Sequence, residues 1–191
     1  SEIMLAVKSG RAIRFPETKV RSTGRGAIGV AGIEVDDATD EVVGMICVNK
    51  DDTERTILVV SEKGYGKRTD LEDYRITGRG GKGVKTISIT EKTGSLVGIL
   101  SVTDEDGLMI ICKSGLTIRL AIDKLRVMGR ATQGVRLINL KGSDSIAGLA
   151  KSPKEEDEDE ESAAEFIEGV DAGEGSAPDI TTETETPQND E

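Results

Sequence analysis

The 191-residue sequence contains no histidine and no tryptophan, and it has only two cysteines and two tyrosines. Histidine is the side chain most often used as a general base, so its absence removes the usual partner of a catalytic nucleophile. Neither tyrosine, Tyr65 or Tyr74, and neither cysteine stands beside a candidate base in the sequence. We therefore predict no catalytic residues in this chain and expect it to act by binding.

The two cysteines, Cys47 and Cys112, are far apart and each lies in a short apolar run. Such residues are typically small buried hydrophobic side chains, and with no histidine nearby they do not form a recognisable metal site. We expect both to be buried, with neither a disulfide framework nor a bound metal.

Long apolar runs are also missing, since no stretch approaches the roughly 20 residues that a helix needs to cross a bilayer. The chain does not open on a signal-peptide pattern, so we expect a cytoplasmic protein with no membrane contact. No segment before residue 152 keeps a helical period over ten residues. Instead, short aliphatic runs end in glycine turns, which predicts strands at 3–7, 57–60 and 108–112, and apolar–polar alternation predicts further strands at 84–90 and 135–140.

Charge is distributed unevenly along the chain, whose net charge is −11. Residues 152–191 hold sixteen of the 36 acidic residues and one of the 25 basic residues. The remainder, residues 1–151, is therefore mildly basic, a pattern typical of nucleic-acid contact or of a self-masking tail. The acidic segment 152–191 has low complexity and few large apolar residues, so we expect a disordered tail.

An internal repeat organises residues 1–151. Similar segments at 22–30, 76–84 and 127–135 have their leading glycines 54 and 51 residues apart. Each is preceded by another glycine fourteen positions earlier, at Gly10, Gly64 and Gly115, and followed about twenty positions later by Gly44, Gly98 and Gly148. Short strands in units of about 50 residues are typical of propeller blades. We predict an all-β fold with about three blades of a β-propeller or β-pinwheel, and we expect them to belong to a larger ring or to associate, because an open ring exposes strand edges.

The loop at 78–83 and its counterpart at 24–29 fit the G-x-G-x-x-G pattern of dinucleotide-binding loops. That function requires a helix directly after the loop, whereas β-patterned sequence follows here. A P-loop would need Ser or Thr after Lys82, and the sequence has Gly83. A nucleotide site is therefore not predicted.

Glycines also allow a loop to approach a DNA backbone closely, while neighbouring cations contact phosphates. Repeated cations on successive blades would form a curved basic track that bends a duplex without reading its bases. The alternative is that the recurring arginines pair with acidic residues such as Glu72 or Asp123 and brace the blades. The candidate DNA-binding residues are Arg79, Gly80, Gly81, Lys82, Gly83 and Lys85, the repeat-related Arg25 and Arg130, and the recurring Arg21, Arg75, Arg126, Arg14, Arg68 and Arg119.

Three phrases occur in order: Lys-Ser-Gly-x-x-Ile-Arg, Gly-Arg-x-x-x-Gly-Val and Asp-x-Val-x-Gly-Met. Together they make residues 2–151 resemble the C-terminal domain of the DNA gyrase A subunit. The segment 79–83, Arg-Gly-Gly-Lys-Gly, is similar to the core of that family's DNA-wrapping box. Thr77 and Gly78 stand where the main box has Gln and Arg. The resemblance thus indicates a second, box-like element in a later blade.

This resemblance implies a six-bladed pinwheel that wraps double-stranded DNA for an ATP-dependent type IIA topoisomerase, which introduces negative supercoils. It implies the gyrase B subunit and the rest of the A subunit as partners in a heterotetramer that holds two copies of each. ATP and Mg2+ are implied for the holoenzyme and no cofactor for this chain, which lacks the Arg-Tyr-Thr context of the DNA-cleaving tyrosine. Two alternatives stay open: the corresponding C-terminal domain of a type IV topoisomerase, and a propeller that serves as a protein-interaction module.

Overall fold

The structure is a computed structural model that describes residues 1–35, 38–49 and 51–154. These residues form eleven strands and two short 3-10 helices, η1 (Glu17–Lys19) and η2 (Leu71–Asp73). The predicted all-β fold is confirmed. Most of the predicted acidic tail, from residue 155 onward, lies outside the described residues. Among the described residues, no helix is both long enough and apolar enough to span a membrane.

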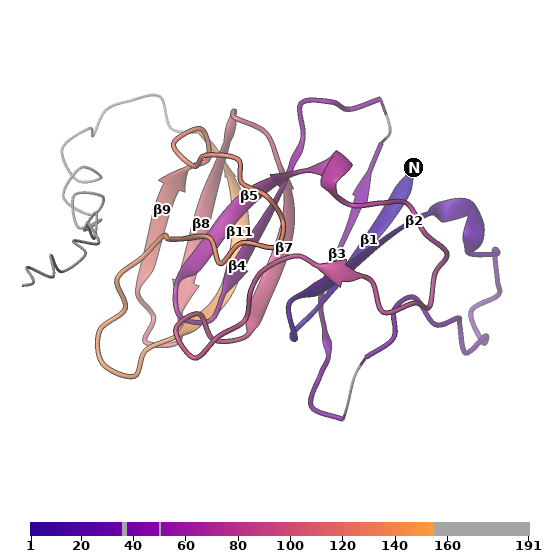
Figure 1. The fold of residues 1–191 in the computed structure, drawn as a ribbon, viewed down its shortest axis with the longest axis horizontal. Helices are drawn as coiled ribbons and strands as arrows, with labels where there is room; N and C mark the ends of the chain where they lie inside the picture. The colour runs from indigo at the N-terminus through magenta and orange to yellow at the C-terminus, as the bar shows by residue number, and fades with distance from the viewer. Residues whose placement is uncertain (36–37, 50, 155–191) are drawn as a thin grey trace, which may run out of the picture.

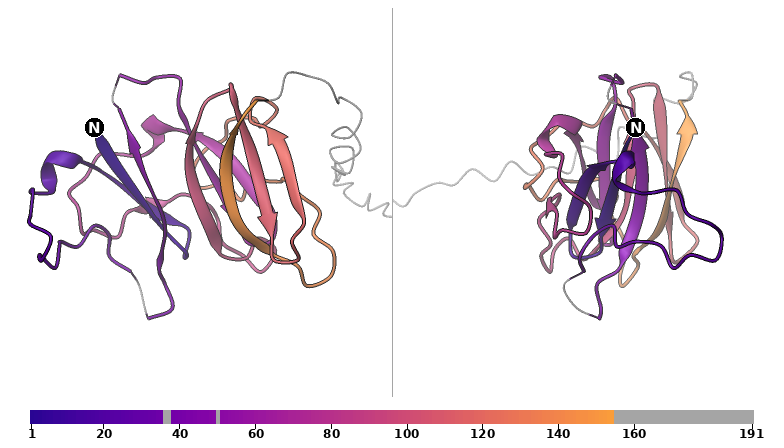
Figure 2. Two further views of the ribbon diagram at one scale, coloured as in Figure 1. Left: turned by 180° about the vertical axis from the view of Figure 1, so that it is seen from behind. Right: turned by 90° about the vertical axis from the view of Figure 1, so that its right-hand side faces the viewer.

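Three antiparallel sheets stand side by side along the longest axis of the molecule (Figure 1; Figure 2). The first sheet has the order β3-β1-β2-β6, the second β10-β5-β4-β7 and the third β11-β8-β9. The strands are β1 (Glu2–Val7), β2 (Arg11–Pro16), β3 (Val42–Val48), β4 (Thr56–Ser61), β5 (Tyr65–Asp70), β6 (Val84–Lys85), β7 (Leu96–Val102), β8 (Asp106–Cys112), β9 (Thr117–Ala121), β10 (Val135–Arg136) and β11 (Ile146–Pro153). The strands predicted at 3–7, 57–60 and 108–112 correspond to β1, β4 and β8.

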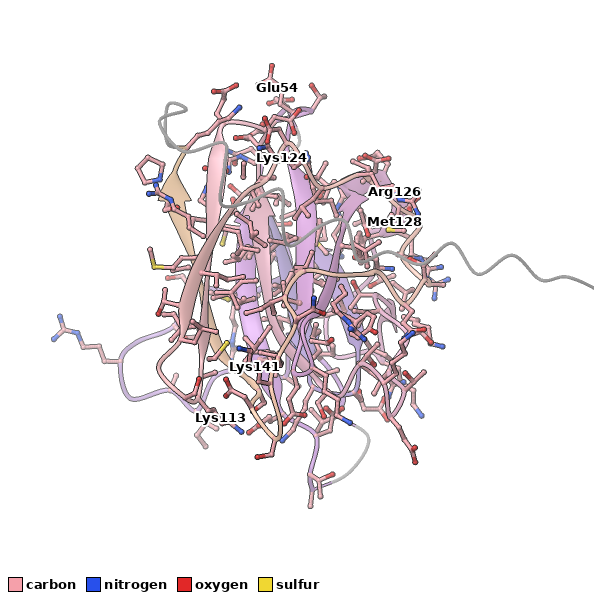
Figure 3. All side chains as sticks on the ribbon, turned by 90° about the vertical axis from the view of Figure 1, so that its left-hand side faces the viewer. Glu54, Lys113, Lys124, Arg126, Met128 and Lys141 are labelled. Carbon is pink, nitrogen blue, oxygen red and sulfur yellow. The ribbon has the colours of Figure 1, made fainter. Side chains whose placement is uncertain are left out.

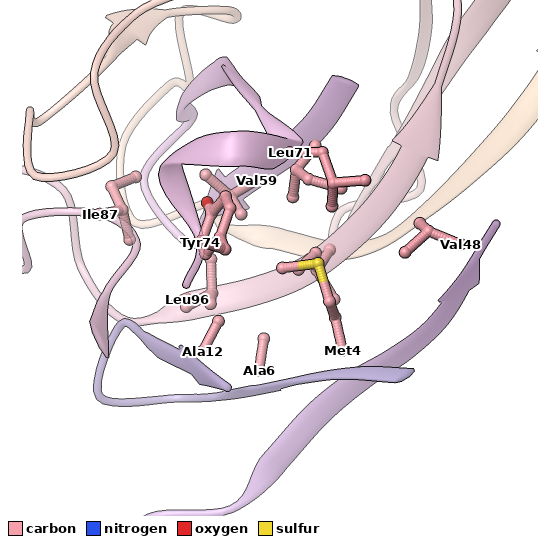
Figure 4. Packing of buried hydrophobic residues seen from close by; sticks show 11 residues of the cluster. Met4, Ala6, Ala12, Val48, Val59, Leu71, Tyr74, Ile87 and Leu96 are labelled. Atoms are coloured by element: carbon pink, nitrogen blue, oxygen red, sulfur yellow. The ribbon is translucent and has the colours of Figure 1, made fainter. Parts of the chain in front are cut away.

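Apolar side chains from facing sheets fill the space between the sheets. Because neighbouring residues of a strand point to opposite faces, Met4 and Ala6 of β1 face the second sheet, where they pack with Val59 and Leu96 (Figure 4). A second cluster joins the other face of the second sheet to the third sheet, around Leu58 and residues of β8. The middle sheet is therefore buried on both faces, which explains why all six residues of β4 are buried.

The outer edges of the first two sheets are completed by residues from the following repeat. Strand β6 pairs with β2 of the preceding repeat, and β10 pairs with β5 in the same way. Both outer strands have only two residues, so the longer strands predicted at 84–90 and 135–140 are wrong. After β6 the amides of Thr86 and Ile87 both donate to the Gly10 carbonyl oxygen, and both side chains are buried.

At the opposite, inner edge of the sheets, glycines let neighbouring blades pack closely. Strands β3, β7 and β11 lie next to one another there. A Cβ atom on Gly44 would lie 2.8 Å from Ile99 Cγ2, and one on Gly98 would lie 2.9 Å from Leu149 Cδ1. A larger residue would displace Ile99 at the first position and the end of the Leu149 side chain at the second, which gives a physical reason for glycine at these two repeat-related positions.

The two cysteines differ in burial. Cys112 on β8 is buried as expected, with 2 % of its surface exposed, and burial followed by the charge of Asp144 raises the pKa of its thiol. Cys47 is exposed, so the expectation of burial is wrong for it. It pairs with Ile3 in the first sheet and so lies on the face that points away from the second sheet.

Candidate nucleic-acid interface

The second and third Gly-Arg loops lie on segments that cross from one blade to the outer edge of the preceding one. We call residues 20–33, 74–87 and 125–138 the crossing segments, because they occupy equivalent positions in the three repeats. In the second crossing segment Ile76 forms a parallel bridge to Arg14, and Lys85 then pairs antiparallel with Arg11. The third follows the same path along β5. The loops 78–83 and 129–134 therefore lie on the outer rim of the first and second sheets.

Glycine is required where the loop 78–83 approaches β2. Gly83 has a φ of 71°, in the left-handed region, and a Cβ atom there would lie 2.7 Å from the Ala12 carbonyl carbon. The repeat-related Gly29 and Gly134 also have positive φ, 90° and 83°. Strand β6 follows directly after Gly83, so the loop does not lead into a helix as a dinucleotide-binding loop would.

Arg14 is an internal side chain that joins the first two blades. Only 4 % of it is exposed, and its Nε donates to Glu2 Oε2 at 2.6 Å. Its Nη1 donates to the carbonyl oxygens of Leu71 (2.8 Å) and Tyr74 (3.1 Å), at and just after η2. The buried guanidinium thus caps backbone groups of the next blade.

Arg68 repeats this arrangement between the second and third blades. It is 5 % exposed, its Nη1 donates to the carbonyl oxygens of Ile122 and Leu125, and its Nη2 lies 2.6 Å from Asp104 Oδ1. The third member of the set, Arg119, is half-buried and donates from Nε to Ser152 Oγ at 3.0 Å. For Arg14 and Arg68 the contacts support the bracing alternative, and neither side chain belongs to the exposed surface.

Arg79 and Arg130 tie each crossing segment to the repeat before it. Arg79 donates to the carbonyl oxygens of Lys19 (3.1 Å) and Ala31 (3.0 Å). Arg130 makes the same pair of bonds one repeat later, to Asp73 (3.1 Å) and Lys85 (2.9 Å). Arg79 is nevertheless exposed and Arg130 half-exposed, so both hold the rim together while keeping charge near the solvent.

The other candidate cations are exposed and lie on the crossing segments. Lys82 has one weak partner, Glu34, whose Oε1 is 3.8 Å away. In the part of the chain that the structure describes, the remaining five side chains have no hydrogen bond or ion pair. These exposed rim cations are Arg21, Arg25, Arg75, Lys82, Lys85 and Arg126.

Exposed lysines also occur outside the crossing segments. Figure 3 shows Lys124 and Arg126 toward one end of the third sheet and Lys113 and Lys141 at the opposite end. The last two are exposed and provide a charge-matched comparison for the rim cations.

Sequence reasoning missed Lys67 on β5. It is 1 % exposed, and its Nζ donates to the carbonyl oxygens of Gly129 (2.8 Å), Arg130 and Thr132 (3.0 Å), and to Thr132 Oγ1 (3.1 Å). The signal available in the sequence was a lysine at the position where the first repeat has Ile13.

The three repeats match one known family. The sequence matches the family described as "DNA gyrase C-terminal domain, beta-propeller" at residues 1–49, 55–103 and 108–153, one match for each sheet. The chain belongs to this DNA gyrase C-terminal domain family.

Relatives and solved structures agree with this assignment. The chain is 41% identical over 159 residues to the DNA gyrase A subunit of Chlamydia pneumoniae, covering 83% of this chain and 19% of the relative. It is 44% identical over 160 residues to the DNA gyrase A subunit of Staphylococcus aureus strain MRSA252, covering 84% of this chain and 18% of the relative. This gyrase C-terminal domain chain thus spans less than a fifth of the length of these relatives.

A solved DNA gyrase A C-terminal domain superposes with a TM-score of 0.70 at 28% identity, over 78% of this chain and 50% of that one. The C-terminal domain of DNA topoisomerase IV gives a TM-score of 0.73 at 19% identity, over 80% of this chain and 46% of that one. At that identity the second likeness concerns the fold alone.

Proposed function

We propose that this gyrase C-terminal domain chain binds double-stranded DNA along its outer rim and bends the duplex around successive blades. The observation that supports this most strongly is the placement of Arg75 and Arg126. They occupy the same repeat position on consecutive crossing segments, they are exposed, and neither has a partner among the described residues. Such side chains are available for phosphates, whereas Arg14 and Arg68 already use their donors inside the protein.

The proposed binding is electrostatic and does not depend on base sequence. Cations that neutralise phosphates release condensed counterions, so affinity falls as salt rises, with a slope of about −0.9 per phosphate contact. The tight packing at Gly44 and Gly98 and the buried arginines fix the angle between blades, which makes the track of cations rigid. A rigid curved track favours bent DNA over straight DNA.

In the longer protein, we propose, this DNA segment is passed to a type IIA topoisomerase that introduces negative supercoils. The proposed partners are the gyrase B subunit and the rest of the A subunit in a cytoplasmic heterotetramer. ATP and Mg2+ would act in those other parts of the holoenzyme, while this chain contributes DNA contacts. The 41% identity to a DNA gyrase A subunit supports this assignment.

The binding proposal is tested by the affinity of the full chain for a linear duplex of mixed sequence, measured over a range of salt concentrations. In R75A/R126A we expect the slope of log affinity against log salt to become shallower by about 2, because two phosphate contacts are lost. The control K113A/K141A removes the same charge from the opposite end of the third sheet and should change the slope by less than half as much. Equal slopes in the two variants would contradict the proposed rim, and salt-insensitive binding would favour a protein-interaction module.

A further inference from the structure

The Lys67 ammonium forms the centre of the turn at residues 129–132. Four oxygen atoms of that turn surround Nζ, three of them backbone carbonyls, although the lysine comes from a strand of the preceding repeat. Thr132 also donates to the Gly129 carbonyl oxygen, from its backbone amide at 3.2 Å and from Oγ1 at 2.9 Å. The turn therefore points its carbonyl groups inward, onto the lysine.

The equivalent loop 78–83 is built differently over the equivalent residue. Ile13 lies beneath it, and a Cβ atom on Gly81 would lie 3.7 Å from Ile13 Cδ1. Gly80 has a φ of 79°, which an Ala at that position would adopt only with strain. The loop 129–134 has Ala131 and Thr132 at these two positions. The loop that has two glycines thus lies over Ile13, and the loop that has Ala131 and Thr132 lies over Lys67.

The two loops also differ in the origin of their charge. Lys82 is exposed on the loop 78–83, whereas Gln133 stands at that position in the loop 129–134. The Lys67 ammonium lies directly beneath the exposed residues Gly129 and Thr132. Positive charge is therefore present at both loops, on the surface of one and inside the other.

We infer that Lys67 is a positioning residue of the DNA-binding rim: it shapes the loop 129–134 and supplies from beneath it the positive charge that Lys82 supplies from the surface of the loop 78–83. This inference rests on the proposed DNA-binding function. It assigns to a buried side chain of one repeat a role in the DNA contact made by the next.

The charge on Lys67 depends on pH close to neutrality. Burial, and secondly the charge of Arg130, lower its pKa to about 8, while the carboxylate of Asp73 opposes this shift. The nearby Tyr74 has a pKa raised by burial, so it stays neutral in this range. A phosphate bound at the loop would favour the charged ammonium, and DNA binding should therefore take up protons near pH 8.

The test is the affinity of the full chain for a linear duplex at constant salt, measured on either side of the Lys67 pKa, at pH 7 and pH 9. For the wild type we expect affinity to fall roughly three- to tenfold between the two, about 1 kcal/mol. In K67M we expect the affinity at pH 7 to be lower than that of the wild type by a similar factor. We also expect the affinity of K67M to fall less between pH 7 and pH 9 than that of the wild type. The control K63M removes an exposed lysine from the same hairpin and should keep the wild-type pH profile.

K67R separates charge from shape, because its guanidinium stays charged throughout this range. We expect K67R to bind within about threefold of wild type at pH 7 and to lose the pH-dependent fall. If K67M and K67R both kept the wild-type pH profile, the inference would be overturned, and Lys67 would be structural only. If K67M did not fold, as judged by circular dichroism, the K67R profile would decide. A wild-type chain that binds no DNA at either pH would contradict the proposed function itself.

Discussion

Arg14 of the first sheet donates from Nη1 to the carbonyl oxygen of Tyr74 in the second blade, at 3.1 Å and across 60 positions of sequence. The same bond recurs one blade later, from Arg68 to Leu125 at 3.2 Å. A repeated bond between consecutive repeats sets a repeated orientation between consecutive blades. The curvature of the rim thus depends on side chains that are not themselves exposed at it.

Replacing Arg68 by methionine should destabilise the chain strongly. R68M leaves the carbonyl groups of Ile122 and Leu125 without their buried donor and removes the partner of Asp104. We expect the free energy of unfolding to fall by about 3 kcal/mol, as for other buried charged networks that lose one member. Urea unfolding followed by circular dichroism measures this change.

The matched control is R126M, which removes an exposed arginine with no partner in the described structure. Surface substitutions of this kind typically change stability by less than about 0.5 kcal/mol. An equal effect of R68M and R126M on unfolding would contradict the bracing role of Arg68.

Gly83 and Gly78 lie in one loop but should respond differently to alanine. G83A introduces a Cβ atom 2.7 Å from the Ala12 carbonyl carbon at a residue with a φ of 71°. We expect a loss of roughly 2 kcal/mol or more in unfolding free energy, because both strain and overlap must be relieved. G78A meets no atom within 4 Å and should change stability by less than a third as much. A large effect of G78A with none of G83A would mean that the loop does not approach β2 in this way.

The architecture was largely predictable because the repeat fixes several positions at once. Gly10, Gly64 and Gly115 mark hairpins with positive φ in all three repeats, and the aliphatic runs that follow or precede them are strands. The pairing of β6 and β10 with the preceding blade was not predictable. A strand of two residues has too short a pattern to indicate which sheet it joins.

Part of the core and of the candidate site could not be predicted because its residues are polar. Strand β5 carries Lys67, Arg68 and Thr69, which a sequence pattern assigns to the surface, yet all three are buried. Lys67 and Arg68 donate to backbone carbonyls of the following repeat, which only the folded arrangement brings near. The sequence also did not distinguish the roles of the recurring arginines: Arg14 donates to a carbonyl of the next blade, whereas Arg21 faces solvent.

Lys67 should make the stability of the chain depend on pH above neutrality. Its folded-state pKa of about 8 is below the value of 10.5 for an unperturbed lysine. Between these values the unfolded chain binds the extra proton, so the free energy of unfolding should rise with pH through this window. Below the folded-state pKa the full cost of the buried charge is present.

Urea unfolding at pH 7.5 and pH 9.5, on either side of the Lys67 pKa, tests this expectation. The increase should be larger in the wild type than in K67M, by roughly 2 kcal/mol. The matched variant K63M should show the wild-type increase. Parallel pH profiles of wild type and K67M would contradict the assigned titration.

The two thiols should react at very different rates with an alkylating reagent. Cys47 is exposed and should be modified in the folded chain. Cys112 is buried, and its raised pKa further reduces the reactive thiolate, so modification should require unfolding. Mass spectrometry of peptides after brief labelling, with a urea-unfolded sample as the control, measures both rates. Equal labelling of the two thiols in the folded chain would contradict the packing of β8.

Bending of DNA around the rim is tested most directly by the linking number of a circle. Nicked circular DNA is ligated in the presence of increasing amounts of the full chain, and the topoisomers are separated after the protein is removed. We expect the wild type to shift the linking number in one direction in proportion to the amount bound, and R75A/K82A/R126A to lose most of that shift. K113A/K141A should behave like the wild type. DNA that is saturated with wild-type chain but shows no shift in linking number would contradict wrapping.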